Sequence, residues 1–264
     1  MSGVCVVHLI WAPLGIEPVR RFVRSHRAHD AGRDHELLVV LNGFQSEQGL
    51  TRVRAELADV EHDELALQHP VQDLDAYRIA VEHASGVTDL CFLNSHTELI
   101  VDGWLAALSH HLRAPGIGLV GATGSHESVF SDTPLPLKPL RRRQYPPFPN
   151  PHLRTNGFML ERDTLLALDW RVGRHKNSAQ MLESGWCGIT RQVVDGGAAA
   201  RVVGRDGVAY PPERWPQSRT FRSGAQDNLL IADNRTRQYA EADAPRRAQL
   251  ARMAWGARAA EAII

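Results

Sequence analysis

The chain has 264 residues, of which 43% are hydrophobic, and this is enough for one large α/β domain with a buried core. Thirty Lys and Arg residues balance thirty Asp and Glu residues, so no overall charge favours nucleic acid or an anionic surface. The cysteines Cys5, Cys91 and Cys187 are widely spaced and odd in number, which excludes a disulfide framework and a thiolate zinc site.

Strand and helix patterns alternate through the first half of the chain. Residues 4–10 form an apolar run typical of a strand, and residues 17–29 place apolar side chains at helical spacing. The further expected elements of this half are strands at 37–41, 65–68, 89–93 and 117–121, and helices at 50–57, 73–84 and 104–112. This alternation predicts an α/β fold with a mostly parallel sheet flanked by helices, in which ligands bind beyond the carboxyl ends of the strands.

The second half is less regular. Prolines crowd residues 134–151 around Arg141, Arg142 and Arg143, which excludes a continuous helix and predicts a long loop crossing one face. These arginines could close over a phosphate, with a solvated charged loop as the alternative. The remaining expected elements are strands at 155–160 and 200–203, and helices at 163–168, at 179–194 and from 245 onward.

The expected location follows from the same patterns. No run approaches the roughly 18 apolar residues that a transmembrane helix needs. Cysteine usage fits a reducing compartment, so we expect a cytoplasmic protein that has no nucleic-acid partner, and peripheral contact with a membrane stays open.

The most informative segment follows the strand at 89–93. Asn94, Ser95 and His96 stand directly after this apolar run, and Asp102-Gly103-Trp104-Leu105 opens the next helix. The arrangement resembles the core of the GT-A glycosyltransferases, in which a strand ends in a DxD or DxH motif. The sequence of this segment is most similar to the Asp-Ser-His motif of polypeptide N-acetylgalactosaminyltransferases. The rest of the chain is more similar to family 2 glycosyltransferases.

The resemblance implies a single GT-A, Rossmann-like domain over 1–264. Residues 1–125 would bind a nucleotide sugar, and residues 126–264 would form an irregular acceptor side with a C-terminal helix. The implied activity is hexosyl transfer from a nucleotide-diphosphate sugar to a glycan or lipid-linked acceptor, as in polysaccharide biosynthesis. Segments 115–124 and 154–160 match family 2 strands, although a tight strand exit and a buried strand explain them equally well.

In such enzymes a Mn²⁺ or Mg²⁺ ion at the motif stabilises the charge on the diphosphate leaving group. The resemblance gives the metal-ligand role to His96 and places Asn94 and Ser95 at the diphosphate. Asn94 replaces the first Asp of the motif, so we expect a weak or absent metal. His126, His152 and His175 are candidates for a second ligand. The structural alternative is a turn at Asn94 and Ser95, with His96 capping the next helix.

The nucleotide itself should lie where the first strand ends. The resemblance assigns Trp11 and Ala12 to the base and ribose and Asp73 to base recognition. Each residue also has an ordinary explanation, since a Trp is often part of a core and an Asp often caps a helix.

Glu183 is the candidate catalytic base. Glu183-Ser184-Gly185 lies where family 2 enzymes place a Glu-Asp pair just before a helix, and the resemblance implies that Glu183 removes the proton of the acceptor hydroxyl. Ser184 replaces the Asp. The alternative is an exposed Glu at a helix start, where the helix dipole favours it.

Two other functions compete with glycosyl transfer. A non-catalytic GT-A relative that binds a nucleotide sugar or a partner protein is credible because Asn94 replaces an acid. A nucleotidyltransferase usually has a Gly-rich signature with Lys or Arg after the first strand, which residues 11–15 do not supply.

Overall fold

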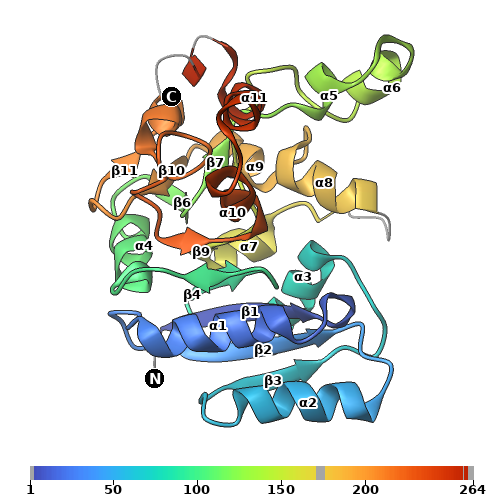
Figure 1. Ribbon diagram of the computed structural model, residues 1–264, viewed down its shortest axis with the longest axis vertical. Coiled ribbons are helices and arrows are strands. Elements are labelled where there is room, and N and C mark those ends of the chain that lie inside the picture. Colours follow the sequence, from blue (N-terminus) through green and yellow to red (C-terminus); the bar gives the residue numbers. More distant parts are fainter. Residues whose placement is uncertain (1–2, 171–175, 258, 261–264) are drawn as a thin grey trace.

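A single eight-stranded sheet organises the computed structural model, which describes residues 3–170, 176–257 and 259–260 (Figure 1). Its strand order is β11-β10-β6-β9-β4-β1-β2-β3. In chain order these strands are β1 (Val4–Trp11), β2 (Glu36–Asn42), β3 (Asp63–Ala66), β4 (Asp89–Leu93), β6 (Ile117–Gly121), β9 (Phe158–Glu161), β10 (Ala199–Val203) and β11 (Ala209–Tyr210). Strands β1 to β4 are parallel, whereas β9 runs antiparallel between β4 and β6, and β11 antiparallel to β10.

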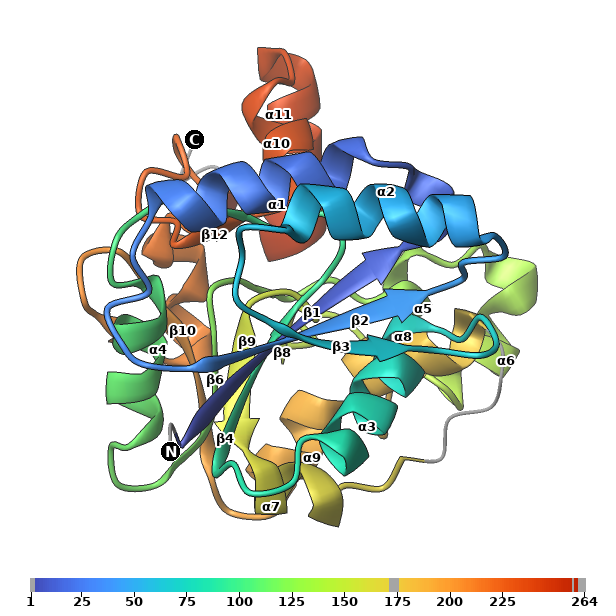
Figure 2. The ribbon, with the colours of Figure 1, turned by 90° about the horizontal axis from the view of Figure 1, so that it is seen from below.

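Helices cover both faces of the sheet (Figure 2). One face packs against α1 (Glu17–Ala28), α2 (Glu47–Leu57) and α4 (Trp104–Leu112). The other packs against α3 (Asp73–His83), α7 (Arg162–Ala167), α8 (Lys176–Ser184) and α9 (Ile189–Asp195). Because both faces are covered, β1 is buried along almost its whole length, and this explains its unbroken apolar sequence.

Smaller elements surround the carboxyl edge of the sheet. Two short antiparallel pairs join β5 (Glu98–Leu99) to β12 (Ile231–Ala232) and β7 (Gly124–Ser125) to β8 (His152–Leu153). The remaining elements are η1 (Ala12–Leu14), α5 (Val129–Asp132), η2 (Leu135–Leu137), α6 (Lys138–Arg142), η3 (Pro212–Ser218), α10 (Asn234–Ala240) and α11 (Ala244–Trp255). No helix of the described ranges is both long and apolar enough to cross a bilayer.

The expected α/β sheet is confirmed, and three local predictions need correction. The single helix expected at 179–194 is two helices, because the chain between α8 and α9 makes close contacts around Gly185. A Cβ atom on Gly185 would lie 2.5 Å from the Met181 carbonyl oxygen. The strand expected at 155–160 begins only at Phe158, after Gly157 adopts a left-handed φ of 67°. Residues 134–151 form no loop across a face: the two short helical turns at Leu135–Leu137 and Lys138–Arg142 lie beside α11, and the chain after them returns to the body of the protein, where Tyr145 and Asn150 are buried (Figure 1).

Candidate functional site

The ends of β1 and β4 are joined by a side-chain hydrogen bond. The backbone N–H of Trp11 donates to Oγ of the buried Ser95 over 2.9 Å. The Trp11 ring packs over Gly43, where a Cβ atom would lie only 2.6 Å from it. The structure therefore places Trp11, Ala12 and Ser95 close together at the carboxyl edge of the sheet.

Asn94 forms a tight turn after β4. Its Oδ1 accepts the backbone N–H of His96 over 2.8 Å, and its own N–H donates to Oδ1 of Asn156 over 2.9 Å. Thr97 Oγ1 also donates to Asn156, over 2.6 Å. The alternative interpretation of Asn94 as part of a turn therefore agrees with the structure. His96, however, does not cap a helix, because β5 follows it and α4 begins only at Trp104, with Gly103 as its N-cap.

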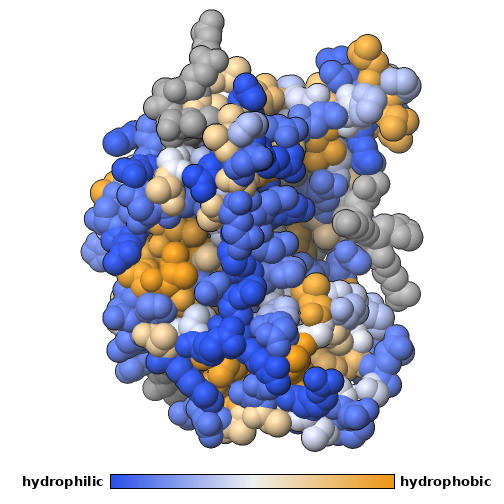
Figure 3. All heavy atoms as spheres, in the orientation of Figure 1, coloured by the Kyte–Doolittle hydropathy of each residue, from blue (hydrophilic) through white to orange (hydrophobic). Residues whose placement is uncertain are grey.

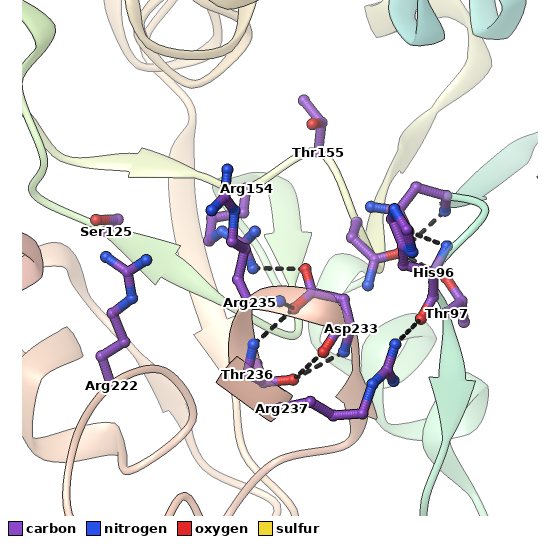
Figure 4. A network of polar contacts seen from close by, with 12 residues as sticks. His96, Thr97, Ser125, Arg154, Thr155, Arg222, Asp233, Arg235, Thr236 and Arg237 are labelled. Carbon is purple, nitrogen blue, oxygen red and sulfur yellow. Dashed lines mark hydrogen bonds and ion pairs between the residues drawn. The ribbon is translucent and has the colours of Figure 1, made fainter. Parts of the chain in front are cut away.

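Positively charged side chains surround His96 (Figure 4). Arg237 donates from Nη2 to the His96 carbonyl over 3.1 Å and from Nη1 to Glu98 over 3.0 Å. The pKa of His96 is lowered, first because the ring is partly buried; Asp233 opposes this shift, whereas Arg237 and Arg235 add to it. The imidazole is therefore held mainly in its neutral form.

A buried ion pair lies near His96 and joins Asp233 to Arg154, the residue that follows β8. Arg154 donates from Nη1 to Oδ2 of Asp233 over 2.7 Å, and the Asp233 side chain is only 1% exposed. Oδ1 of Asp233 accepts the backbone N–H groups of Arg235 and Thr236 and so caps α10. Burial alone would raise the pKa of Asp233, but Arg154 and these N–H donors hold it below its ordinary value.

These groups do not fit a divalent cation. The Asn94 oxygen accepts from His96, and both Asp233 oxygens are occupied by Arg154 and by the start of α10. Within the described ranges no cluster of three or more His, Cys, Asp and Glu side chains could hold a metal ion. His126 and His152 bond to the carbonyls of Pro212 and Asn150, and His175 lies outside the described residues.

A polar cavity of about 290 Å³ opens beside the ion pair. Its charged lining consists of three acids and three arginines: Glu127, Asp132, Glu183, Arg154, Arg222 and Arg235. Arg222 is 4% exposed and donates from Nη1 to Oε1 of Glu127 over 2.6 Å. Its Nε–H is buried and has no acceptor among the described residues.

Glu183 faces this cavity from the last turn of α8. It therefore lies at a helix end and not at the helix start that its sequence context suggested. Its Oε1 accepts two hydrogen bonds from Thr155, from N–H over 3.1 Å and from Oγ1 over 3.2 Å. These two hydrogen bonds hold the carboxylate of Glu183 in place at the edge of the cavity.

Asp73 lies close to Glu183, in the first turn of α3. It does not cap the helix, because Gln72 occupies the N-cap position. The pKa of Asp73 is raised by desolvation and then by repulsion from Glu183, although the residue is exposed at the surface. The predicted base-recognition residue therefore lies within electrostatic range of the predicted catalytic base, but it does not line the polar cavity.

Sequence reasoning missed the pairing of Glu127 with Arg222. The two residues are 95 positions apart, and neither stands in a segment with a recognisable motif. Only the folded chain brings them together, beside Arg154 and Glu183.

A larger hollow, of about 910 Å³, lies at the opposite edge of the sheet. It is lined by the segment that leads into β2, including His29 and His35, together with Trp104. Trp104 belongs to the segment that carries the resemblance, but none of the residues predicted to bind the donor or a metal, or to act as the base, lines this hollow. Ligands of open α/β sheets bind at the carboxyl ends of the strands, so the candidate site is the polar cavity that Glu183 faces, near the Asn94–His96 turn.

Among the comparisons with known proteins, only the one with solved structures gives information on the fold. No family model and no curated protein matches the sequence. Among solved structures, the mannosyltransferase PcManGT from Pyrobaculum calidifontis, in complex with GDP-Man and Mn²⁺, aligns with a TM-score of 0.50 and 16% identity over 83% of this chain and 60% of that chain. GalNAc-T7 with UDP, GalNAc and Mn²⁺ aligns with a TM-score of 0.50 and 13% identity over 79% of this chain and 42% of that chain.

The chain has the GT-A fold, as its sequence predicted. It spans about 60% and 42% of the lengths of these two structures, so it matches only part of each.

Proposed function

We propose that this chain is a glycosyltransferase that moves a sugar from a nucleotide diphosphate to a hydroxyl group of a glycan or lipid-linked acceptor. The observation that carries the proposal is the position of Glu183, which faces a polar cavity beside the Asn94–His96 turn at the carboxyl edge of a GT-A sheet. The donor nucleoside would lie against Trp11, Ala12 and Asp73.

The diphosphate would lie between Ser95, His96 and the first turn of α10. A phosphate there would meet the guanidinium groups of Arg235 and Arg237, which already surround His96. Guanidinium groups pair strongly with phosphate oxygens. We therefore propose that arginines supply most of the positive charge that this site offers to the diphosphate, with any divalent cation contributing weakly.

The reaction follows from this arrangement. The acceptor hydroxyl attacks C1 of the donor sugar, a new C1–O bond forms, and the bond from C1 to the diphosphate oxygen breaks. Glu183 takes the hydroxyl proton, while Arg235 and Arg237 stabilise the charge that develops on the departing nucleoside diphosphate. A single displacement of this kind inverts the configuration at C1.

A thermal-shift panel of nucleotide sugars tests this function. A donor that binds only the folded state raises stability by about 2.7 kcal/mol at a concentration of 100 times its Kd. We expect a clear rise in Tm with at least one uridine, guanosine or thymidine diphosphate sugar. The absence of any shift across the panel, with and without manganese, would count against nucleotide-sugar binding altogether.

A non-catalytic GT-A relative is the second candidate. The observation that favours it is Asn94, whose neutral side chain replaces an acid and whose oxygen is engaged by His96. Such a protein would shift in Tm with a nucleotide sugar but would neither hydrolyse nor transfer it, whatever the acceptor.

Replacing Arg235 should weaken diphosphate binding. Hydrogen bonds to charged groups contribute about 1.5–3 kcal/mol, so Arg235→Gln should raise the Kd of the nucleoside diphosphate by roughly 10- to 100-fold. The free nucleoside should bind almost equally to both proteins, as titration calorimetry would show. Arg246→Gln, on the exposed side of α11, is the matched control. Equal losses for nucleoside and diphosphate would place Arg235 away from the phosphates.

Replacing Asn94 by Asp should strengthen the response to manganese. The carboxylate keeps an acceptor for the His96 N–H and adds a negative charge close to the imidazole. That charge should increase manganese affinity by at least about tenfold. Gln48→Glu, which adds the same charge on α2, should leave the affinity unchanged. Manganese titrations that coincide for wild type and Asn94→Asp would show that residue 94 does not face a bound metal.

A further inference from the structure

Residues 134–143 expose three leucines at the end of the molecule that carries α5 and α6. The side chains of Leu135, Leu137 and Leu140 are 80%, 55% and 60% exposed. Figure 3 shows hydrophobic spheres at this corner of the molecule, above α6. Single exposed leucines are ordinary, but three within six residues form a local apolar surface.

The same segment carries a concentrated positive charge. Lys138, Arg141, Arg142 and Arg143 alternate with or follow the leucines, and residues 133–149 contain no Asp or Glu. The chain as a whole has no net charge, so this concentration is local. Leucine side chains flanked by several cations are the composition that inserts at the surface of an anionic bilayer.

The segment is anchored to the body of the protein. Trp186, which follows α8, donates its ring N–H to the Arg142 carbonyl and its backbone N–H to the Gln144 carbonyl, each over 3.0 Å. Tyr145 is buried below the segment. Trp186 itself is 46% exposed, so an amphipathic ring lies at the base of the segment, with the Arg191 guanidinium 5.0 Å from its centroid.

This surface adjoins the candidate cleft. Val129 and Asp132 of α5 line the polar cavity, and they precede the leucine segment directly. On the other side, Glu183 lies three positions before Trp186. A partner that binds the leucines would therefore lie next to the polar cavity, on the side proposed for the acceptor.

We propose that residues 134–143, together with Trp186, form a docking surface for an anionic lipid bilayer. A second copy of the chain or another protein would also cover leucines, but four cations with no acid among them match a uniformly anionic surface better than a mixed protein surface. A consequence that rests on the proposed function is the class of acceptor: a cavity opening beside the bilayer suits a lipid-linked acceptor.

Vesicle co-sedimentation tests the docking surface. The whole chain is mixed with vesicles of phosphatidylcholine alone or of phosphatidylcholine with phosphatidylglycerol, at low and at high salt. We expect binding to the anionic vesicles that falls with salt, because each basic residue close to an anionic surface strengthens binding roughly fivefold.

Two pairs of substitutions locate the contact. Arg142→Gln with Arg143→Gln should weaken binding by about 30-fold, and Leu135→Ser with Leu137→Ser by at least about 100-fold. The control pairs are Arg24→Gln with Arg52→Gln, and Leu14→Ser with Leu166→Ser, all exposed and on other elements. Melting curves establish that each variant is folded.

The proposal is overturned if the wild type sediments equally with both kinds of vesicle, or if the patch variants bind like their controls. It is also overturned if light scattering shows a dimer that Leu135→Ser with Leu137→Ser dissociates, since a second copy would then cover the leucines. Nucleotide-sugar binding is measured separately by thermal shift, so failure of the docking surface and failure of the proposed function remain distinguishable.

Discussion

Glu183→Gln is expected to lower turnover by roughly 100-fold or more and to leave donor binding nearly unchanged. Gln keeps the shape of the side chain and can still accept from Thr155 at its amide oxygen, so the packing at the end of α8 should survive. What is lost is the proton acceptor that faces the cavity. An acceptor hydroxyl is a poor nucleophile at neutral pH, and the loss should therefore appear in kcat.

The measurement compares kcat with donor Kd for the wild type, Glu183→Gln and a control, Glu82→Gln, which changes an exposed carboxylate on α3. Normal turnover in Glu183→Gln would show that another group is the base, and Asp73 is the alternative, because desolvation and then repulsion from Glu183 raise its pKa. Analysis of the product anomer by NMR completes the test, since a retained configuration contradicts the single displacement proposed for Glu183.

The first half of the fold was predictable because its signals are local. Strands β4 and β6 have the bounds that their apolar runs suggested, and the helix spacing after each strand points to one covered sheet. The antiparallel direction of β9 was not predicted, because the direction of a strand depends on the path of the loops around it and cannot be read from a short strand such as Phe158–Glu161.

The site was predictable only in part. Asn94, Ser95 and His96 directly follow a predicted strand. Their position at the carboxyl edge of the sheet could therefore be predicted from the local sequence pattern together with the resemblance. Arg154 and Asp233 are 79 residues apart, and no local pattern pairs them. Their pairing decides the chemistry of the site, because it occupies the carboxylate that acts on the His96 ring and leaves guanidinium groups near the space proposed for the diphosphate.

Arg154→Met is expected to lower the free energy of unfolding by about 3–5 kcal/mol, because it removes one partner of a buried ion pair. Asp233 would keep its charge at 1% exposure without a counter-ion. Arg154 also stacks over the Phe221 ring, 4.4 Å from its centroid, and Met retains much of this apolar contact. Urea denaturation at neutral pH measures the loss.

A double-mutant cycle isolates the pair. Asp233→Asn keeps an oxygen that can accept the N–H groups at the start of α10, and it removes the charge. Arg154→Met combined with Asp233→Asn should therefore cost less than the sum of the two single changes. Additive costs would show that the two side chains do not interact in solution.

Acid provides an independent test of the same pair. The folded-state pKa of Asp233 is depressed, so the carboxylate contributes stability that is present above its unfolded pKa of about 3.9 and is lost as the pH falls toward the folded value. Between neutral pH and about pH 3, the wild type should lose more unfolding free energy than the double variant, which lacks this carboxylate. Identical pH dependence in both proteins would mean that Asp233 is not stabilised by Arg154, and the arginines around His96 would then need another counter-ion.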